Sequence, residues 1–435
     1  DDQWAEFPRA IRLQVRPRLS VDLPNGDVVN ATVGVTTEDR TGGFLLSTTD
    51  DDPYRQELRT RNVDLGVRGR RLLAGGGRLE LKLSGFYQST SHRIDDQRFR
   101  DRRSSVFAEA SWAGRLGPGE LVAGLSYQRD KFDQLDLTGF DYAHSVPAVF
   151  GQLAYPLSDV ARATLSARCE RHNVYGSFCT PHASLLLRPS PWVTARLTAS
   201  AGYAAPSVLS GRAEVIGLQA FVPTAMNAER IQHGGLELSW IRDRLRLRAQ
   251  ATFTRITRAV QVVPVPDDAA GRLRLVNAAN PTRVFAGDLE ARYQAGLVGL
   301  RAWYSYGYGH EDVPGDTGRR VVGWLPRHAL GGAISLDDLV PGSFAELRTR
   351  YVGLQYVWDD PFRTKTPGYF LTDGTVSARA GRARLYLSGE NLFDVRLRDY
   401  EVVVLPTPGL GGQRTATQWL PARGRVISFG ATVEW

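Results

Sequence analysis

Hydrophobic and polar positions alternate along most of this chain, and the closing segment, Arg425–Trp435, shows the pattern clearly. In RVISFGATVEW every second residue from Ile427 to Trp435 is apolar, and the residues between them are mostly small or polar. Such period-two alternation places one kind of residue on each face of a β-strand. A strand that crosses a membrane in a barrel needs about 9–11 residues of this kind, although a strand of a soluble β-sandwich has the same pattern.

Segments with this alternation recur along the whole chain. We predict strands at 9–22, 28–40, 58–72, 78–91, 104–113, 120–130, 146–156, 161–172, 179–188, 192–205, 230–240, 244–262, 283–294, 299–309, 327–337, 343–356, 369–380, 382–393 and 425–435. Short turns such as 23–27 and 74–77 alternate with long polar links such as 41–57 and 92–103. Short turns on one side and long loops on the other are typical of an outer-membrane barrel. The pattern therefore predicts an all-β, antiparallel transmembrane β-barrel with about nineteen visible strands.

The segment 244–253 indicates which face of these strands meets lipid. Arg244, Arg246 and Arg248 share one face, while leucine, alanine and phenylalanine residues share the other. An arginine facing the middle of the bilayer would cost about 2–4 kcal/mol, so the arginines must face a polar lumen or something that fills it. These arginines, with Arg382 and Arg384, either bond to a domain inside the barrel or attract an anionic solute. Their position near the short turns favours the first interpretation.

The strand count predicts that this barrel needs a further strand. The last strand must end on the side of the short turns, and counting back shows that the first strand also runs toward that side. The count is therefore odd, whereas a closed bacterial barrel has an even number of strands. We expect at least one strand before Asp1, paired with the edge of Arg425–Trp435.

Charge and composition narrow the classes of function. The formal net charge is +8, and nearly all positive charge is arginine, since the only lysines are Lys82, Lys131 and Lys365. The arginines are spread along the predicted strands rather than gathered in one cluster, which argues against a nucleic-acid-binding protein. No apolar run approaches the roughly 18 residues of a membrane helix, and the 44 glycines fit many short strands and turns.

Short motifs in the second half of the chain resemble those of the TonB-dependent outer-membrane receptors. They cover about residues 175–435 and come in the order of that family. The matching residues are Tyr203, Ala205, Pro206 and Ser207; Glu229; Asn277, Gly287 and Glu290; Pro326 and His328; the run ENLFD at 390–394; and the closing GRVISFGATVEW at 424–435. Each motif is weak alone, and six in the right order are specific together. Residues 1–174 fit the family's early strands in pattern rather than in motif.

The resemblance implies a fold, a place in the cell and a function. Family barrels have 22 strands and enclose an amino-terminal plug, which is preceded by a box that the TonB-type energy-transducing protein grips. Neither plug nor box is found here, so 1–435 is expected to be barrel domain only. The resemblance implies a receptor in the outer membrane, surrounded by lipid and lipopolysaccharide, that imports a scarce metal chelate such as a ferric siderophore or cobalamin. The alternative is a receptor-like barrel that serves as a scaffold or pore in a larger outer-membrane complex.

Two cysteines lie on either side of a predicted hairpin tip. Cys169 and Cys179 share the face of apolar residues such as Leu165 and Leu185, so they can face each other across the two strands. The cell surface and periplasm are oxidising. We therefore predict a disulfide that closes a loop of about ten residues and stabilises the hairpin by roughly 2–3 kcal/mol.

Aromatic residues gather near the long-loop ends of the predicted strands. They are Tyr304, Tyr306, Tyr308, Trp324, Tyr356, Trp358, Phe362, Tyr400 and Trp419. Barrels place aromatic girdles at membrane interfaces, which accounts for such residues without a ligand. The alternative is a stacking wall for a planar ligand. Because Trp324, Trp358, Phe362 and Trp419 lie at or beyond the strand ends, they are our candidate ligand-binding residues.

The sequence does not favour catalysis or a bound cofactor. His310–Asp312 and Asp50–Asp52 offer donors for a divalent cation, but acidic residues in loops are more often simply solvated. No nucleophile elbow, phosphate loop or His-x-x-x-His spacing is present. We expect no metal site, no cofactor and no enzyme activity, while a Ser–His–Asp arrangement would be recognised only by geometry.

Overall fold

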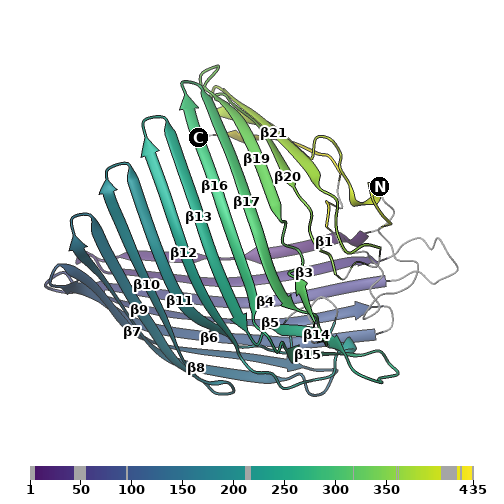
Figure 1. Cartoon of the computed structure of the whole chain (residues 1–435). Coiled ribbons are helices and arrows are strands. Elements are labelled where there is room, and N and C mark those ends of the chain that lie inside the picture. The colour runs from purple at the N-terminus through teal and green to yellow at the C-terminus, as the bar shows by residue number, and fades with distance from the viewer. Residues whose placement is uncertain are drawn as a thin grey trace. The chain divides into compact units, whose positions relative to one another are not determined.

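The computed structural model is nearly all β-strand (Figure 1). It describes residues 5–43, 55–94, 97–210, 217–316, 318–358, 360, 362–402, 419–421 and 424–433. Its strands are β1 (Ala5–Val15), β2 (Arg18–Asp22), β3 (Val28–Gly43), β4 (Arg55–Leu72), β5 (Arg78–Ile94), β6 (Gln97–Leu116), β7 (Gly119–Gln134), β8 (Tyr142–Ser158), β9 (Ala161–His172), β10 (Gly176–Ser190), β11 (Val193–Ala204), β12 (Glu229–Arg242), β13 (Leu245–Thr257), β14 (Val260–Pro264), β15 (Leu273–Asn277), β16 (Thr282–Ala295), β17 (Val298–Asp312), β18 (Arg319–Val321), β19 (His328–Asp337), β20 (Phe344–Val352), β21 (Tyr369–Ala380), β22 (Ala383–Glu390) and β23 (Val426–Val433). Two single 3-10 turns, Leu218–Ala220 and Leu397–Asp399, complete the described elements.

Twenty-one of the strands form one antiparallel sheet, and β14 and β15 form a separate hairpin. The strands β1 and β2 both pair with β3 and act as two parts of one strand, interrupted at Pro17, which has no N–H to donate to the ladder. The three-residue β18 is an addition beside the end of β17. With these two cases allowed for, the described sheet corresponds strand by strand to the nineteen predicted from the sequence.

Two compact units make up the chain. Unit 1 contains Asp1–Pro156, Thr164–His182 and Gly202–Ala228, and unit 2 contains Leu157–Ala163, Ala183–Ala201 and Glu229–Trp435. In unit 1 the buried apolar residues include Phe132, Phe178, Leu218 and Phe221. In unit 2 a loop core is formed by Val357, Leu397, Trp419 and Leu420. In both units much of the large apolar surface is on the strands and is exposed, as the alternation predicts.

Several predicted boundaries are wrong in unit 1. The predicted links 92–103 and 41–57 are partly strand, because β5 and β6 pair without interruption as far as Ile94 and Gln97, and β3 and β4 pair as far as Gly43 and Arg55. The strand predicted at 146–156 also begins earlier, at Tyr142. Polar residues predominate in the added parts of β3, β4, β5 and β6, so period-two alternation did not detect them.

In unit 2 the predicted strand 244–262 is two strands. Arg258 has a φ of 60°, in the left-handed region, which ends β13 at Thr257 and lets β14 start in a new direction. The hairpin of β14 and β15 then occupies much of the link before β16. The predicted strand 343–356 is shorter, since β20 ends at Val352.

The closing strand behaves as its alternation predicts. Residues of β23 pair with β22 from Val426 opposite Glu390 to Val433 opposite Ala383. This register places Ile427, Phe429 and Ala431 on the same face as leucines of β22. The expected further strand before Asp1 remains a prediction. Within the described part of the chain, no helix has the length and apolar content needed to span a bilayer.

Candidate functional site

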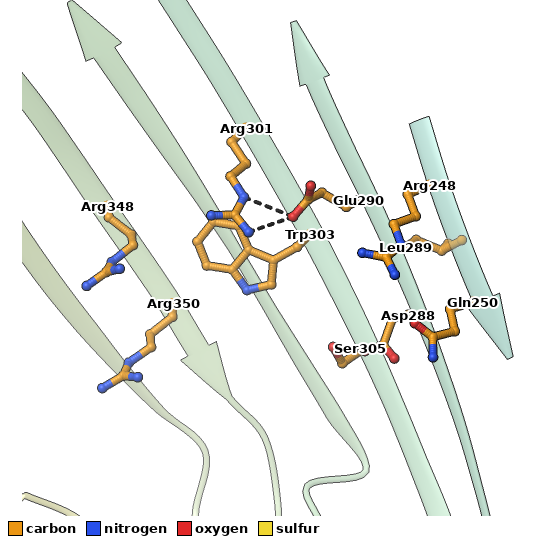
Figure 2. A pocket seen from close by; sticks show the side chains of 10 residues that line it. All are labelled: Arg248, Gln250, Asp288, Leu289, Glu290, Arg301, Trp303, Ser305, Arg348 and Arg350. Carbon is orange, nitrogen blue, oxygen red and sulfur yellow. Dashed lines mark hydrogen bonds and ion pairs between the residues drawn. The ribbon is translucent and has the colours of Figure 1, made fainter. Parts of the chain in front are cut away.

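A pocket of about 450 Å³ lies on the polar face of unit 2, over β13, β16, β17 and β20. We call it the arginine pocket, and Figure 2 shows the side chains that line it. They are Arg248, Gln250, Asp288, Leu289, Glu290, Arg301, Trp303, Ser305, Arg348 and Arg350. Except for Leu289, all of them share the polar face that alternation predicts. The pocket therefore follows from the side-chain period of four strands of one sheet, with β19 lying between β17 and β20.

Strand register brings most of these side chains into two adjacent rows, and Gln250, Asp288 and Ser305 lie opposite one another in a third. In one row Arg248 lies opposite Glu290, Glu290 opposite Trp303, and Trp303 opposite Gly331. Gly331 in turn lies opposite Arg350. Directly opposed residues have Cβ atoms about 4.5–5.5 Å apart, so each side chain reaches the next strand.

The second row consists mainly of arginine. Arg246 lies opposite Arg292, and Arg292 lies opposite Arg301. Farther along the row, Ala333 separates Arg301 from Arg348. Like charges directly opposite each other on a sheet are unfavourable, so this row needs carboxylates beside it.

Glu290 supplies the central counter-charge. Its Oε1 accepts from Nε of Arg292 at 2.6 Å, and its Oε2 accepts from Nη2 of Arg301 at 2.6 Å. Figure 2 draws the two contacts between Arg301 and Glu290. At the edges of the pocket, Arg248 pairs with Glu237 at 3.1 Å and Arg348 with Asp373 at 2.9 Å. The carboxylates thus hold the arginines in place without neutralising all of them.

The pocket keeps one arginine unpaired within the described structure. Three of its four lining arginines, Arg248, Arg301 and Arg348, are paired with the carboxylates of Glu237, Glu290 and Asp373. Arg350 forms no ion pair with any residue that the structure describes. Asp288 is engaged by the Ser305 hydroxyl at 2.6 Å. An anion that entered the pocket would therefore find guanidinium donors with unused hydrogen-bonding capacity.

Trp303 places one aromatic ring among these charges. The guanidinium carbon of Arg301 lies 5.2 Å from the centre of its ring. Figure 2 shows the indole in the middle of the pocket, with Arg348 and Arg350 on one side of it. Opposite Trp303 stands Gly331, which has no side chain to compete for the space. The ring therefore forms an apolar surface inside a polar pocket.

A second group of residues joins two of the long links of unit 2. The indole N–H of Trp358 donates to the Val321 carbonyl at 2.8 Å, and its ring stacks on Tyr356 with centroids 4.9 Å apart. The Arg320 guanidinium lies 5.4 Å from the Trp358 ring. Trp324 donates its backbone N–H to Tyr356 at 2.9 Å, has a φ of 62° and is exposed. The structure thus brings together two of the four candidate ligand-binding residues, Trp324 and Trp358.

The other two candidates occupy different environments. Phe362 is exposed, and its backbone N–H donates to Oδ1 of Asp360. Trp419 is only 4% exposed and belongs to the loop core with Val357 and Leu397. Its burial means that its ring supports the loop and does not present a face to solvent.

Trp419 also contacts a buried charge cluster. Its indole N–H donates to Oε1 of Glu401 at 2.7 Å, and Nε of Arg363 lies 2.6 Å from the other oxygen of Glu401. Arg363 packs over the Trp419 ring at 5.1 Å. Burial raises the pKa of the Glu401 carboxyl, and the nearby Asp360 carboxylate adds to the rise, while Trp419 and Arg363 oppose it. Protonation of Glu401 therefore changes the charge inside a packed loop.

The disulfide predicted from the sequence is present in unit 1. Cys169 and Cys179 are bonded, with Cα atoms 4.1 Å apart. Beside the bond, the ring of Phe178 stacks on Tyr203 with centroids 3.8 Å apart. The Tyr175 hydroxyl donates to the Pro206 carbonyl. The disulfide hairpin therefore packs against the Tyr203 to Ser207 motif, a contact that the sequence did not reveal.

The remaining sequence candidates have ordinary partners or fall outside the described residues. Asp312 accepts from Arg319 at 2.7 Å and from the backbone N–H of Asn280 at 2.7 Å. His310 stacks edge-on against Tyr308. The described residues contain no group of three or more histidine, cysteine or acidic side chains placed to hold a metal ion. Asp50–Asp52 lie outside the described residues.

Sequence reasoning missed Trp303 and the carboxylates of the arginine pocket as site residues. The segment RAWYSYGYGH at 301–310 already indicated their position. Its alternation puts Arg301, Trp303 and Ser305 on one face and the tyrosines at 304, 306 and 308 on the other. The structure places those tyrosines on the apolar face, opposite residues such as Leu289 and Phe285. That position is typical of a membrane-interface girdle.

Comparison with known proteins gives consistent results. A family model described as TonB dependent receptor-like, beta-barrel matches residues 19–392. The FrpB iron transporter from Neisseria meningitidis (F3-3 variant) is similar in structure, with a TM-score of 0.75, 12% identity, and coverage of 98% of this chain and 72% of that one. A mutant of the ferric enterobactin receptor PfeA from Pseudomonas aeruginosa gives a TM-score of 0.73, 13% identity, and coverage of 99% and 71%. The siderophore receptor PirA from Acinetobacter baumannii gives a TM-score of 0.71 and 11% identity, with coverage of 97% of this chain and 70% of that one. No curated protein sequence matches the chain.

Proposed function

Because the chain belongs to the TonB-dependent receptor-like β-barrel family, we propose that it binds an anionic metal chelate and carries it into the cell. The chain is an outer-membrane β-barrel protein, and the polar face of its strands lines the lumen of such a barrel. The proposed ligand is a ferric siderophore or a similar chelate. We assign the protein a transport role and no catalytic step.

One observation carries the proposal: the arginine pocket on the lumen face keeps one arginine unpaired among the described residues. Three of the four lining arginines are paired with carboxylates, and Arg350 forms no ion pair within the described part of the chain. A lumen wall built only for mechanical stability would be expected to balance its charges, because unpaired like charges repel. An anionic chelate would complete the pairing, and Trp303 would contact its planar groups.

The long links of unit 2 suggest where a ligand would first bind. Trp324 and Phe362 are exposed, and Trp358 is held beside Trp324 by hydrogen bonds between the two links. We propose that Trp324, Trp358 and Phe362 contact the ligand, while Trp419 supports the loop from its core. Rings attached to loops with few rotatable bonds offer contact area at low entropic cost.

The names of similar structures support this class of ligand. They include an iron transporter, a ferric enterobactin receptor and a siderophore receptor. At 11–13% identity these proteins support the fold only, so the chelate itself must be found by experiment. Cobalamin has a planar ring system without comparable negative charge, so the arginine pocket favours a ferric chelate over it.

Transport of this kind needs an energy source and a gate. We propose that residues 1–435 form the barrel domain and work together with a plug domain outside this range. A TonB-type protein would move the plug by gripping a coupling box. The alternative, a scaffold or pore in a larger complex, requires neither. Growth on one ferric chelate as the only iron source, with and without the gene, separates the two roles.

Binding is tested directly with chelates of different charge. An anionic ferric tris-catecholate should quench the tryptophan fluorescence of the full chain in neutral detergent. A neutral ferric hydroxamate should quench it much less. The double variant R348Q/R350Q should weaken catecholate binding by about tenfold or more, equivalent to about 1.4 kcal/mol.

The pair Arg255 and Arg283 provides a control, since they lie opposite each other on the apolar face of β13 and β16. The variant R255Q/R283Q should bind the chelate like the wild type. Equal binding of neutral and anionic chelates, or equal loss in both variants, would contradict the proposed site.

A further inference from the structure

On the apolar face of unit 1, the three strands β4, β6 and β7 carry basic side chains at the same end. They are Arg59 and Arg61 on β4, Arg100 and Arg102 on β6, and Arg129 and Lys131 on β7. We call these six residues the basic patch, and all six are exposed. Strand β5 lies between β4 and β6 (Figure 1). The patch lies at the end away from the turn 73–77 between β4 and β5, which is the end of the long loops.

Strand register shows that the patch lies on the same face as the apolar residues. Arg61 and Arg102 are both opposite Ser89 of β5, on its two sides. One step toward the turns, Val63 is opposite Tyr87. Because side chains alternate between faces, residues two apart share a face. The basic patch therefore continues the lipid-facing surface and does not belong to the lumen.

The depth of the patch follows from the length of the apolar stretch on β5. Leu79, Leu81, Leu83 and Tyr87 share the face and span nine residues. About 9–11 residues of a tilted strand cross the hydrocarbon core. Ser89, the next residue on this face, is therefore at the level of the lipid headgroups. Since long loops lie on the extracellular side, these are headgroups of the outer leaflet.

Part of the patch is left without a protein counter-charge. Nη2 of Arg100 is 2.7 Å from Asp136, and Lys131 is 2.8 Å from Asp133. Arg59 is 3.8 Å from Glu57 and remains 68% exposed. Arg61, Arg102 and Arg129 form no ion pair with the residues that the structure describes. These three guanidinium groups remain available to an external anion.

The corresponding surface of unit 2 has a different composition. At the same end of the apolar face, β16, β17, β20 and β21 carry mainly aromatic rings, together with Arg283. The rings belong to Phe285, Tyr304, Tyr306, Tyr308, Tyr351 and Phe370. Such rings are the ordinary side chains of a membrane interface. The basic patch therefore differs from this aromatic surface, although Arg230, Arg255 and Arg283 also lie at this end of the apolar face, on β12, β13 and β16.

We infer that the basic patch binds the phosphate groups of a phosphorylated glycolipid in the outer leaflet, of the lipid A type. Guanidinium groups donate paired hydrogen bonds to phosphate, which makes arginine better suited than lysine to this contact. Arg61 and Arg102, two strand spacings apart, are separated by roughly 10 Å at the backbone, which leaves room for phosphate between them. The acyl chains would lie on the leucines below, and Tyr87 would lie at the boundary.

The inference is tested by lipid binding to the full chain purified in neutral detergent. Titration with bis-phosphorylated lipid A, followed by native mass spectrometry, should show binding that weakens with added salt. Dephosphorylated lipid A and phosphatidylglycerol should bind at least tenfold more weakly. The triple variant R61Q/R102Q/R129Q should lose at least tenfold in affinity for lipid A, and the matching triple lysine variant should regain only part of it.

Arg71 provides the matched control, because it lies on the same face of β4 at the opposite, short-turn end. R71Q should bind lipid A like the wild type, and R61Q alone should bind it more weakly. Equal binding by the triple variant and the wild type would overturn the inference. Tight binding of phosphatidylglycerol, or of dephosphorylated lipid A, would overturn the assignment to lipid A phosphates. These results do not depend on whether the protein imports a chelate.

Discussion

The indole of Trp303 occupies the space that a side chain at Gly331 would need. A Cβ atom built on Gly331 would lie 2.1 Å from Cζ2 of Trp303 and 2.7 Å from the Thr349 carbonyl oxygen. The two residues are directly opposite each other on β17 and β19. Glycine at this position therefore allows the tryptophan to lie flat between the carboxylates and Arg350.

The variant G331A should displace the Trp303 ring. Overpacking of this kind costs about 1–3 kcal/mol, so the denaturant midpoint of the detergent-folded protein should fall. Tryptophan quenching by the anionic chelate should weaken as well, because the ring moves within the arginine pocket. G332A is the control on the same strand, since a Cβ there has its nearest neighbour at 3.6 Å. Equal stability of both variants would show that the ring moves without cost.

The variant E290Q should change binding more than stability. Glu290 bridges Arg292 and Arg301, whose side chains are about half exposed, and exposed ion pairs contribute about 0–1 kcal/mol. Removing the carboxylate leaves the arginine pocket more positive, so its affinity for the anionic chelate should increase severalfold. Fluorescence titration of E290Q beside the wild type measures this effect. A decrease in affinity would mean that Glu290 positions the arginines for the ligand.

Alternation along the sequence predicted the sheet strands of unit 2 and their polar faces, although it missed the end of β13 at Thr257 and the end of β20 at Val352. In a strand a side chain has only two directions, so Arg246 and Arg248 could be assigned to the polar face without coordinates. The register between strands was harder to predict. Arg248 lies opposite Glu290, with the hairpin of β14 and β15 in the link 258–281 between their strands, and link length does not determine that register.

Loop packing could not be predicted for a related reason. Trp419 was grouped with Trp358 because both are aromatic and lie beyond the strands, but the structure buries Trp419 in the loop core. Burial in a loop depends on contacts between residues far apart in sequence, here Val357, Leu397 and Trp419, and a periodic pattern does not predict such contacts. The disulfide was predictable because Cys169 and Cys179 lie on paired strands close to one tip.

Removal of the disulfide should destabilise the unit 1 hairpin. The bond joins residues ten apart, and a loop of that size contributes about 2–3 kcal/mol in the chain-entropy account. The double variant C169S/C179S should therefore unfold at lower denaturant than the oxidised wild type. Reduced wild-type protein should unfold like the double variant. If reduction has no effect on the wild type, the hairpin is held by the Phe178–Tyr203 stack and its neighbours rather than by the bond.

Protonation of Glu401 should stabilise the loop core of unit 2. The pKa of Glu401 is raised by burial in the folded protein, whereas the unfolded chain has the ordinary value of 4.5. Ionising the carboxyl therefore costs more in the folded state. Stability from this group is highest below pH 4.5 and is lost as the pH rises from there through the raised pKa.

The variant E401Q tests this relation because glutamine keeps an oxygen that accepts from the Trp419 indole N–H but cannot ionise. The midpoint temperature of thermal unfolding, measured from pH 4.5 to pH 8, should fall less steeply with rising pH in E401Q than in the wild type. E346Q, which removes a carboxylate from the polar face of β20, is the control and should retain the wild-type slope. Parallel curves for E401Q and the wild type would show that Arg363 fully compensates the ionised carboxylate. In that case the charge cluster would hold the loop equally well at either protonation state.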